Sequence, residues 1–127
     1  MRLTVTSVTE PETGRVSFES RYGCGVGFWQ GTLPTVGNRY EVEFGVEEVL
    51  RLGVDLVSVQ EASKPSVMTD GLGTSLIGEL LQIDQDGTAA ARIGESVLLF
   101  EMKGRVDSLP SWVRLGPLRL LLYDSNC

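Results

Sequence analysis

The amino-acid sequence predicts an all-β fold, or a β fold with one short helix. Apolar and polar residues alternate with a period of two along several segments, which is the pattern of strands with one buried face. Glycine, proline, asparagine and aspartate recur about every ten residues, which is the spacing of turns between short strands. Only one segment, residues 46–53, has helical spacing. Together these observations favour a barrel or a sandwich.

The most informative alternation runs from Val16 to Phe28, and it predicts one long strand over Arg15–Gln30. Its apolar phase contains Val16, Phe18, Tyr22, Cys24, Val26 and Phe28. Its other phase contains three glycines in succession, Gly23, Gly25 and Gly27, which we expect on the outer face. Glycine inside a strand is typical of a sharp bend or of close approach by another group. The segment therefore indicates a strongly coiled strand in a small barrel.

The other expected elements follow from the same signals. We expect strands over residues 2–9, 39–44, 54–59, 76–83, 89–102, 112–115 and 118–123. Residues 46–53 predict two turns of helix that end at Gly53. Asp86-Gly87 predicts a two-residue hairpin turn, and Gly94 predicts a bulge. The segment Glu61–Ser75 has no periodicity, so we expect it to be the most mobile loop.

Seven to eight short strands with one helix in mid-chain favour a small barrel of the oligonucleotide-binding-fold type. The 127 residues are enough for a single domain, 1–127, that buries its own core. Two strands supply the residues that we expect to point into this core: Val16, Phe18, Val26, Phe28, Tyr40, Val42 and Phe44.

The chain is acidic, with a formal net charge of −6 from 17 acidic and 11 basic residues. A nucleic-acid-binding surface is usually basic, so this charge favours either a basic protein partner or simple solubility. The sequence has no apolar region of signal-peptide type and no apolar run long enough for a membrane span. We therefore expect a cytoplasmic protein without a membrane partner.

The chain contains no histidine, which removes Ser-His and Cys-His nucleophiles and most zinc sites. Its two cysteines, Cys24 and Cys127, are far apart in sequence; we expect Cys24 to be buried and Cys127 exposed. These absences predict a protein that is not an enzyme and that uses no cofactor or metal. One catalytic alternative stays open, because Glu41 and Glu43 are expected about 6.8 Å apart on one strand face. Paired-carboxylate hydrolases use a similar separation, although an ordinary solvated strand face has the same pattern.

A candidate binding surface follows from antiparallel pairing of the strands over 15–30 and 39–44. When both apolar sets stay on one face, three outer positions of the first strand oppose three outer positions of the second. The candidate binding residues are Trp29 opposite Arg39, Gly27 opposite Glu41, and Gly25 opposite Glu43. The expected result is a shallow outer groove with a glycine floor, closed by a cation–π pair, that accepts a basic side chain or strand. Alternatively, the glycines serve only to let the strand coil.

Three segments resemble those of small, acidic, uncharacterised bacterial β-barrel proteins, some of which are similar to immunity proteins that neutralise toxins. These segments are Gly37–Phe44, Glu48–Gly53 and Leu120–Asp124. Their residues are structural, so the resemblance transfers no active site. What it implies is a non-catalytic protein that binds another protein.

The sequence therefore favours a non-catalytic protein-binding domain, such as an acidic immunity or inhibitor protein for a basic partner. The alternative is a module that binds single-stranded nucleic acid, in which Trp29, Arg21 and Arg39 would stack on bases. Glutamates on the same outer phase as these residues would repel phosphate and count against this alternative. A carboxylate-based enzyme is the third possibility.

Overall fold

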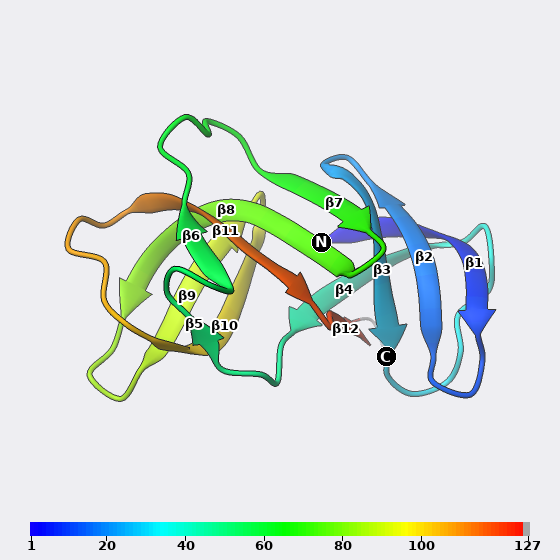
Figure 1. Cartoon of the computed structure of the whole chain (residues 1–127). Coiled ribbons are helices and arrows are strands. Elements are labelled where there is room, and N and C mark those ends of the chain that lie inside the picture. The colour runs from blue at the N-terminus through cyan, green and yellow to red at the C-terminus, as the bar shows by residue number, and fades with distance from the viewer. Residues whose placement is uncertain (126–127) are drawn as a thin grey trace.

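The computed structural model describes residues 1–125, and in this range the chain forms twelve β-strands and no helix, which confirms the all-β prediction (Figure 1). The strands are β1 (Arg2–Glu10), β2 (Arg15–Ser20), β3 (Gly23–Trp29), β4 (Arg39–Gly45), β5 (Leu50–Arg51), β6 (Leu56–Ser58), β7 (Ser66–Asp70), β8 (Gly73–Ile83), β9 (Thr88–Ile93), β10 (Ser96–Lys103), β11 (Ser111–Leu118) and β12 (Leu121–Asp124). The expectation for Cys127 lies outside the described residues.

Strands β1–β4 and β12 close into a barrel with the order β1-β2-β3-β12-β4. The strands β1, β2 and β3 are consecutive antiparallel neighbours, and β4 returns to lie antiparallel beside β1. This is the arrangement of a Greek key. Strand β12 closes the barrel, because it pairs in parallel with β3 and antiparallel with β4.

The chain between β4 and β12 forms a second sheet with the order β5-β10-β9-β8-β11-β6, and β7 pairs with β8 beside it. An isolated parallel bridge between Leu52 and Leu56 brings the two ends of this order together, so the sheet is nearly closed. Figure 1 shows the two barrel-like sheets side by side, with β7 and the start of β8 next to β3. The described residues thus contain a larger and more divided architecture than one barrel of seven to eight strands.

A single hydrophobic cluster connects the interiors of both sheets. The first barrel contributes Leu3, Val5, Phe18, Val42 and Leu122, and the second sheet contributes Leu56, Leu80, Ile93, Leu98 and Leu115, among others. Burial of this apolar area removes it from water inside each sheet and where the two sheets meet. It therefore stabilises each sheet and also holds the two sheets together.

The predicted long strand over 15–30 is wrong, because a turn at Arg21-Tyr22 divides it into the hairpin of β2 and β3. In this hairpin Phe18 lies opposite Gly25 and Val16 opposite Gly27. Directly opposed residues share a face of the sheet, so the glycines point into the barrel and not outward. A Cβ atom on Gly25 would lie 2.5 Å from Cζ of Phe18, which explains why glycine occupies this position.

Because the chain reverses at this turn, the odd-numbered residues of β3 face the core, and not the even-numbered residues that were predicted to do so. Val16, Phe18, Val42 and Phe44 are buried as expected, and Tyr40 is partly buried against the core. In contrast, Val26 and Phe28 lie on the outer face of β3 and are only partly buried, so their assignment to the core is wrong. Cys24 is exposed for the same reason, which corrects the expectation that it is buried.

The helix expected over 46–53 is also absent from the described chain, and β5 occupies part of the segment. The backbone here pairs with β10 and then turns instead of forming a helix: the amide of Leu52 donates to Lys103, and the amide of Gly53 donates to nearby Leu56 at the start of β6. Gly53 has a φ of +87°, which suits a turn. Tertiary hydrogen bonding therefore overrides the short helical spacing.

Two further expectations need correction. The patternless segment 61–75 contains β7, which pairs with β8 through a turn that includes Leu72. The Asp86-Gly87 hairpin is confirmed between β8 and β9. However, the strand expected over 89–102 is a second hairpin, in which Gly94 adopts a φ of +62° between β9 and β10. The alternation over 89–102 is imperfect, so the sequence alone does not locate this turn.

Thr74, at the start of β8, ties the two sheets together. Its side chain is fully buried, and its hydroxyl both donates to the carbonyl of Val26 at 2.6 Å and accepts from the amide of Val26 at 2.9 Å. Nearby, the amide of Val67 on β7 donates to the carbonyl of Tyr22 at 2.9 Å. These bonds satisfy backbone amide and carbonyl groups along the edge of β3, which would otherwise need a neighbouring strand as their partner.

Candidate functional site

Two adjoining hollows lie along the outer side of β4, and they share Glu41 and Glu95. The first, here named the arginine hollow, has a volume of about 520 Å³ and is lined by Arg2, Leu3, Thr4, Glu19, Ser20, Arg21, Arg39, Glu41 and Glu95. The second, here named the acidic hollow, has a volume of about 360 Å³ and is lined by Met1, Glu41, Val42, Glu43, Phe44, Glu95, Ser96, Val97 and Ser125. The shared residues make the two hollows one continuous surface.

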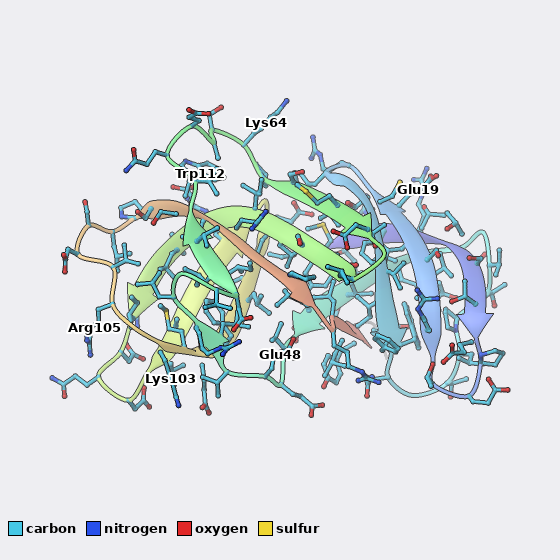
Figure 2. The ribbon with its side chains drawn as sticks, viewed as in Figure 1. Glu19, Glu48, Lys64, Lys103, Arg105 and Trp112 are labelled. Atoms are coloured by element: carbon cyan, nitrogen blue, oxygen red, sulfur yellow. The ribbon has the colours of Figure 1, made fainter. Side chains whose placement is uncertain are left out.

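The register of β1 with β2 and β4 determines which charged side chains lie side by side in the arginine hollow. Thr4 on β1 lies opposite both Arg39 on β4 and Glu19 on β2, so these three side chains form one row across the outer face. The next row pairs Arg2 with Glu41. Figure 2 shows Glu19 on the first barrel, at the opposite end of the molecule from Lys103. The hollow therefore combines three guanidinium groups with three carboxylates.

Only part of this charge is paired internally. Nε of Arg2 donates to Glu41 at 3.1 Å. Within residues 1–125, Arg21 and Arg39 form no salt bridge, although the guanidinium of Arg21 lies 5.7 Å from the ring centre of Tyr22. Two of the three guanidinium groups are thus available to a ligand or partner.

A hydrogen bond between two hairpin tips forms the wall at Glu95. The hydroxyl of Tyr22, in the β2–β3 turn, donates to the carboxylate of Glu95, in the β9–β10 turn. This bond is the main cause that lowers the pKa of the Glu95 carboxyl, and partial burial opposes it. The same bond raises the pKa of the Tyr22 hydroxyl. Glu95 is therefore held as an anion at the junction of the two hollows.

The acidic hollow lies between β4 and the start of β10. Three glutamates line it, and two positive groups lie beside Glu41: the Met1 amino group, which donates to the carbonyl of Val42 at 2.8 Å and lies 3.8 Å from Glu41, and the guanidinium of Arg2, at 3.1 Å. Val97, on the opposite wall, is 56% exposed. The Ser96 hydroxyl is buried and has no hydrogen-bond partner within the described residues. This hollow presents carboxylates beside an apolar surface.

A third hollow, here named the aromatic hollow, lies on the outer face of β3 and has a volume of about 270 Å³. The guanidinium of Arg119 lies 4.0 Å from the ring centre of Phe28, which is a cation–π contact. Arg15 lies opposite Phe28 on β2, and Leu72, at the tip of the β7–β8 hairpin, is 82% exposed on another wall. The aromatic hollow is the most basic of these surfaces.

The structure separates the predicted binding residues into two groups. Arg39, Glu41 and Glu43 lie on the outer side of β4 and line the two adjoining hollows. Trp29, Gly25 and Gly27 are buried on the inner face of β3.

The predicted outer groove is wrong in its geometry, because β12 lies between β3 and β4 and these strands do not pair. The expected pair of Trp29 with Arg39 is absent from the described contacts. Instead, Trp29 packs edge-on against Tyr40, with ring centres 4.9 Å apart.

The sequence analysis missed Glu95, Val97 and Leu99. A signal was present, since residues 97–100 are all apolar, and a strand that buries one face needs only every second residue to be apolar. The excess apolar residues on the solvent face, Val97 and Leu99, are 56% and 64% exposed. Glu95 carries no such signal, because only folding brings it to Tyr22.

The fold and its surfaces define an all-β protein with a Greek-key barrel and an additional sheet. Comparisons of the chain with protein-family models, with curated proteins and with solved structures found no match. Within residues 1–125, no group of three or more histidine, cysteine, aspartate or glutamate side chains is placed to hold a metal ion. The described part of the chain also contains no helix that is long and apolar enough to cross a membrane.

Proposed function

We propose that this chain is a non-catalytic protein-binding domain, such as an immunity or inhibitor protein, and that it binds a basic partner along β4 and β10. One observation supports this most: the acidic hollow places three glutamates next to the exposed side chain of Val97. An apolar surface with a charged rim is typical of a protein-binding site.

The negative charge of this chain is the reason that we expect a positively charged partner. The chain has a net charge of −6, and the acidic hollow adds local carboxylates to this overall field. A basic partner would be attracted over a distance and would form charge pairs at the rim of the contact. Charge pairs at a rim affect the rate of association and its dependence on salt more than they affect affinity.

The proposal is tested with a short labelled peptide of alternating lysine and valine, titrated with the protein while fluorescence anisotropy is recorded. We expect saturable binding that weakens with added salt, and a further loss of about two- to fivefold in the Glu43→Gln variant. Glu12→Gln is the control, since it removes an equal charge from the distant β1–β2 turn. Absence of binding at low salt, or equal loss in both variants, would contradict the proposal.

The alternative function is binding of single-stranded nucleic acid, and the aromatic hollow favours it. We propose that the first barrel is of the oligonucleotide-binding-fold type, since it has five strands in a Greek key. In such barrels the face of the second and third strands contacts the ligand. Here that face carries Phe28 between Arg15 and Arg119. Aromatic and guanidinium groups of this kind stack on bases.

Labelled oligothymidylate is the matching probe for the alternative. The leading proposal predicts no binding at moderate salt, because the net charge opposes phosphate. If oligothymidylate binds with a strong salt dependence, and Phe28→Leu reduces the affinity while Glu43→Gln does not, the alternative is correct.

A further inference from the structure

We propose that the unpaired edge of β10 binds an extended segment of the basic partner as an added β-strand. This inference rests on the proposed function, and it identifies the part of the surface that provides the main hydrogen bonds. Its occupant is a segment in which lysine or arginine alternates with apolar residues.

The hydrogen-bond pattern shows which edge of β10 is open, in the sense that its backbone groups have no hydrogen-bond partner in the described part of the chain. On one side, β10 pairs with β9 over residues 96–101. On the other side, it pairs only with β5, at Met102 and Lys103. The amide of Met102 donates to Gly87 on the β9 side, whereas the carbonyl of Lys103 accepts from Leu52 on the β5 side.

Alternation along a strand then assigns the remaining groups. The amides and carbonyls of Val97, Leu99 and Glu101 point the same way as those of Lys103, which is toward the open edge. Strand β4 packs near this edge, but no hydrogen bond joins β4 and β10 among the described residues. Three consecutive edge positions therefore lack a backbone partner in the described chain.

Unpaired strand edges normally carry protection against association. On β10 the protection is limited: β5 covers one end, and Glu101 supplies one charge. Between these, Val97 and Leu99 are 56% and 64% exposed. An edge with exposed apolar side chains is a template for strand addition, in which the backbone provides affinity and the side chains provide selectivity.

Charge complementarity selects the occupant. A strand added at Val97 enters the acidic hollow, where Glu41, Glu43 and Glu95 lie. Basic side chains on the added strand would therefore meet carboxylates, while its apolar side chains would cover Val97 and Leu99. A second copy of this chain fits less well, because each copy carries a net charge of −6 and would bring further carboxylates to the same place.

Amide hydrogen exchange with and without the lysine–valine peptide tests this inference directly. We expect the peptide to slow exchange at Val97, Leu99 and Glu101 by at least about tenfold. Exchange at Leu98 and Phe100 should stay unchanged, since β9 already protects these amides. If the peptide binds but the three edge amides gain no protection, the strand addition is wrong while the proposed function stands.

Two further measurements isolate the backbone. The same peptide with all internal amides N-methylated keeps its charges, and it should lose at least about tenfold in affinity for the unmodified protein. In the protein, Leu99→Pro removes one donor from the open edge only, a position at which an edge strand accepts proline. The Leu99→Pro variant should bind the peptide more weakly than the unmodified protein does, whereas Leu99→Ala should retain most of the binding.

Equal binding of the methylated and unmethylated peptides would overturn the inference. A second result would also overturn the inference: the edge amides are already protected without peptide, and this protection rises with protein concentration. That result would mean that a second copy of the chain occupies the edge.

Discussion

At the scale of single residues, the space inside the first barrel limits the size of the inward-facing residues of β3. Gly25 and Gly27 point inward, where the ring of Phe18 and the side chain of Leu122 fill the volume that a Cβ atom would need. Trp29 continues the same inner face and is 4% exposed. The glycines therefore serve the packing of the core and not an outer groove.

Gly25→Ala tests this assignment. The added Cβ would lie 2.5 Å from the Phe18 ring, so the ring must move, and we expect a loss of about 1–3 kcal/mol in the free energy of unfolding. Gly71→Ala is the control, because nothing lies within 4 Å of its Cβ position. Urea unfolding measures both. Equal stability of the two variants would show that the core has room at Gly25.

Thr74→Val tests the hydrogen bonds between the sheets. Valine keeps the shape of the side chain but leaves the amide and carbonyl of Val26 without their partner. Each unsatisfied group costs about 1–3 kcal/mol, so we expect a total loss of at least about 2 kcal/mol in urea unfolding. Thr74→Ser keeps the hydroxyl and should lose clearly less. A valine variant as stable as the wild type would mean that water replaces these bonds.

At the scale of elements, hairpin tips bring together what the sequence keeps apart. The β2–β3 turn supplies Tyr22 and the β9–β10 turn supplies Glu95, and their hydrogen bond holds Glu95 at the junction of the two hollows. A Cβ atom on Gly94 would overlap the Tyr22 ring, so glycine is needed at this contact as well as for the turn. The contact couples the edge of β10 to the first barrel.

The titration of Glu95 predicts a pH dependence for this contact. The pKa of Glu95 is lowered in the folded state, so the stabilisation is present above the ordinary carboxyl pKa of 4.5 and is lost as the pH falls through the folded value. We therefore expect the difference in unfolding midpoint between wild type and Tyr22→Phe to shrink between neutral and strongly acidic pH. A difference that does not change with pH would contradict the charged hydrogen bond.

Several elements were predictable from sequence, and others were not, for a physical reason. The Asp86-Gly87 turn carries its own backbone preference, so local sequence suffices to place it. The apolar alternation continues in sequence through the turn at Arg21-Tyr22, and Gly94 lies in a segment whose alternation is imperfect, so both turns depend on tertiary pairing. Arg39, Glu41 and Glu43 were expected on the outer face of their strand and lie there, but their neighbours across β1 and β10 follow only from the fold.

At the scale of the whole molecule, two barrel-like sheets share one hydrophobic cluster, and the chain crosses between them twice. This arrangement predicts that they unfold together as the single domain expected from chain length. The chain has two tryptophans, Trp29 in the first barrel and Trp112 on the second sheet (Figure 2). Each sheet therefore has its own fluorescent reporter.

Trp112→Phe leaves a reporter in the first barrel, and Trp29→Phe leaves one on the second sheet. In each variant, we expect the urea transition followed by fluorescence to coincide with the transition followed by circular dichroism. Coincidence within each variant is the criterion, because the two substitutions change overall stability by different amounts. A fluorescence transition that is separate from the circular dichroism transition would show that the sheets are independent domains.

The most direct test of the proposed function is a map of amide chemical shifts with two probes, the lysine–valine peptide and oligothymidylate. We expect the peptide to shift resonances over Glu41–Glu43 and Val97–Glu101, and oligothymidylate to shift none at moderate salt. The opposite result would contradict the account: shifts confined to Arg15, Phe28 and Arg119 with oligothymidylate, and none along β4 and β10 with the peptide, would assign the molecule to nucleic-acid binding.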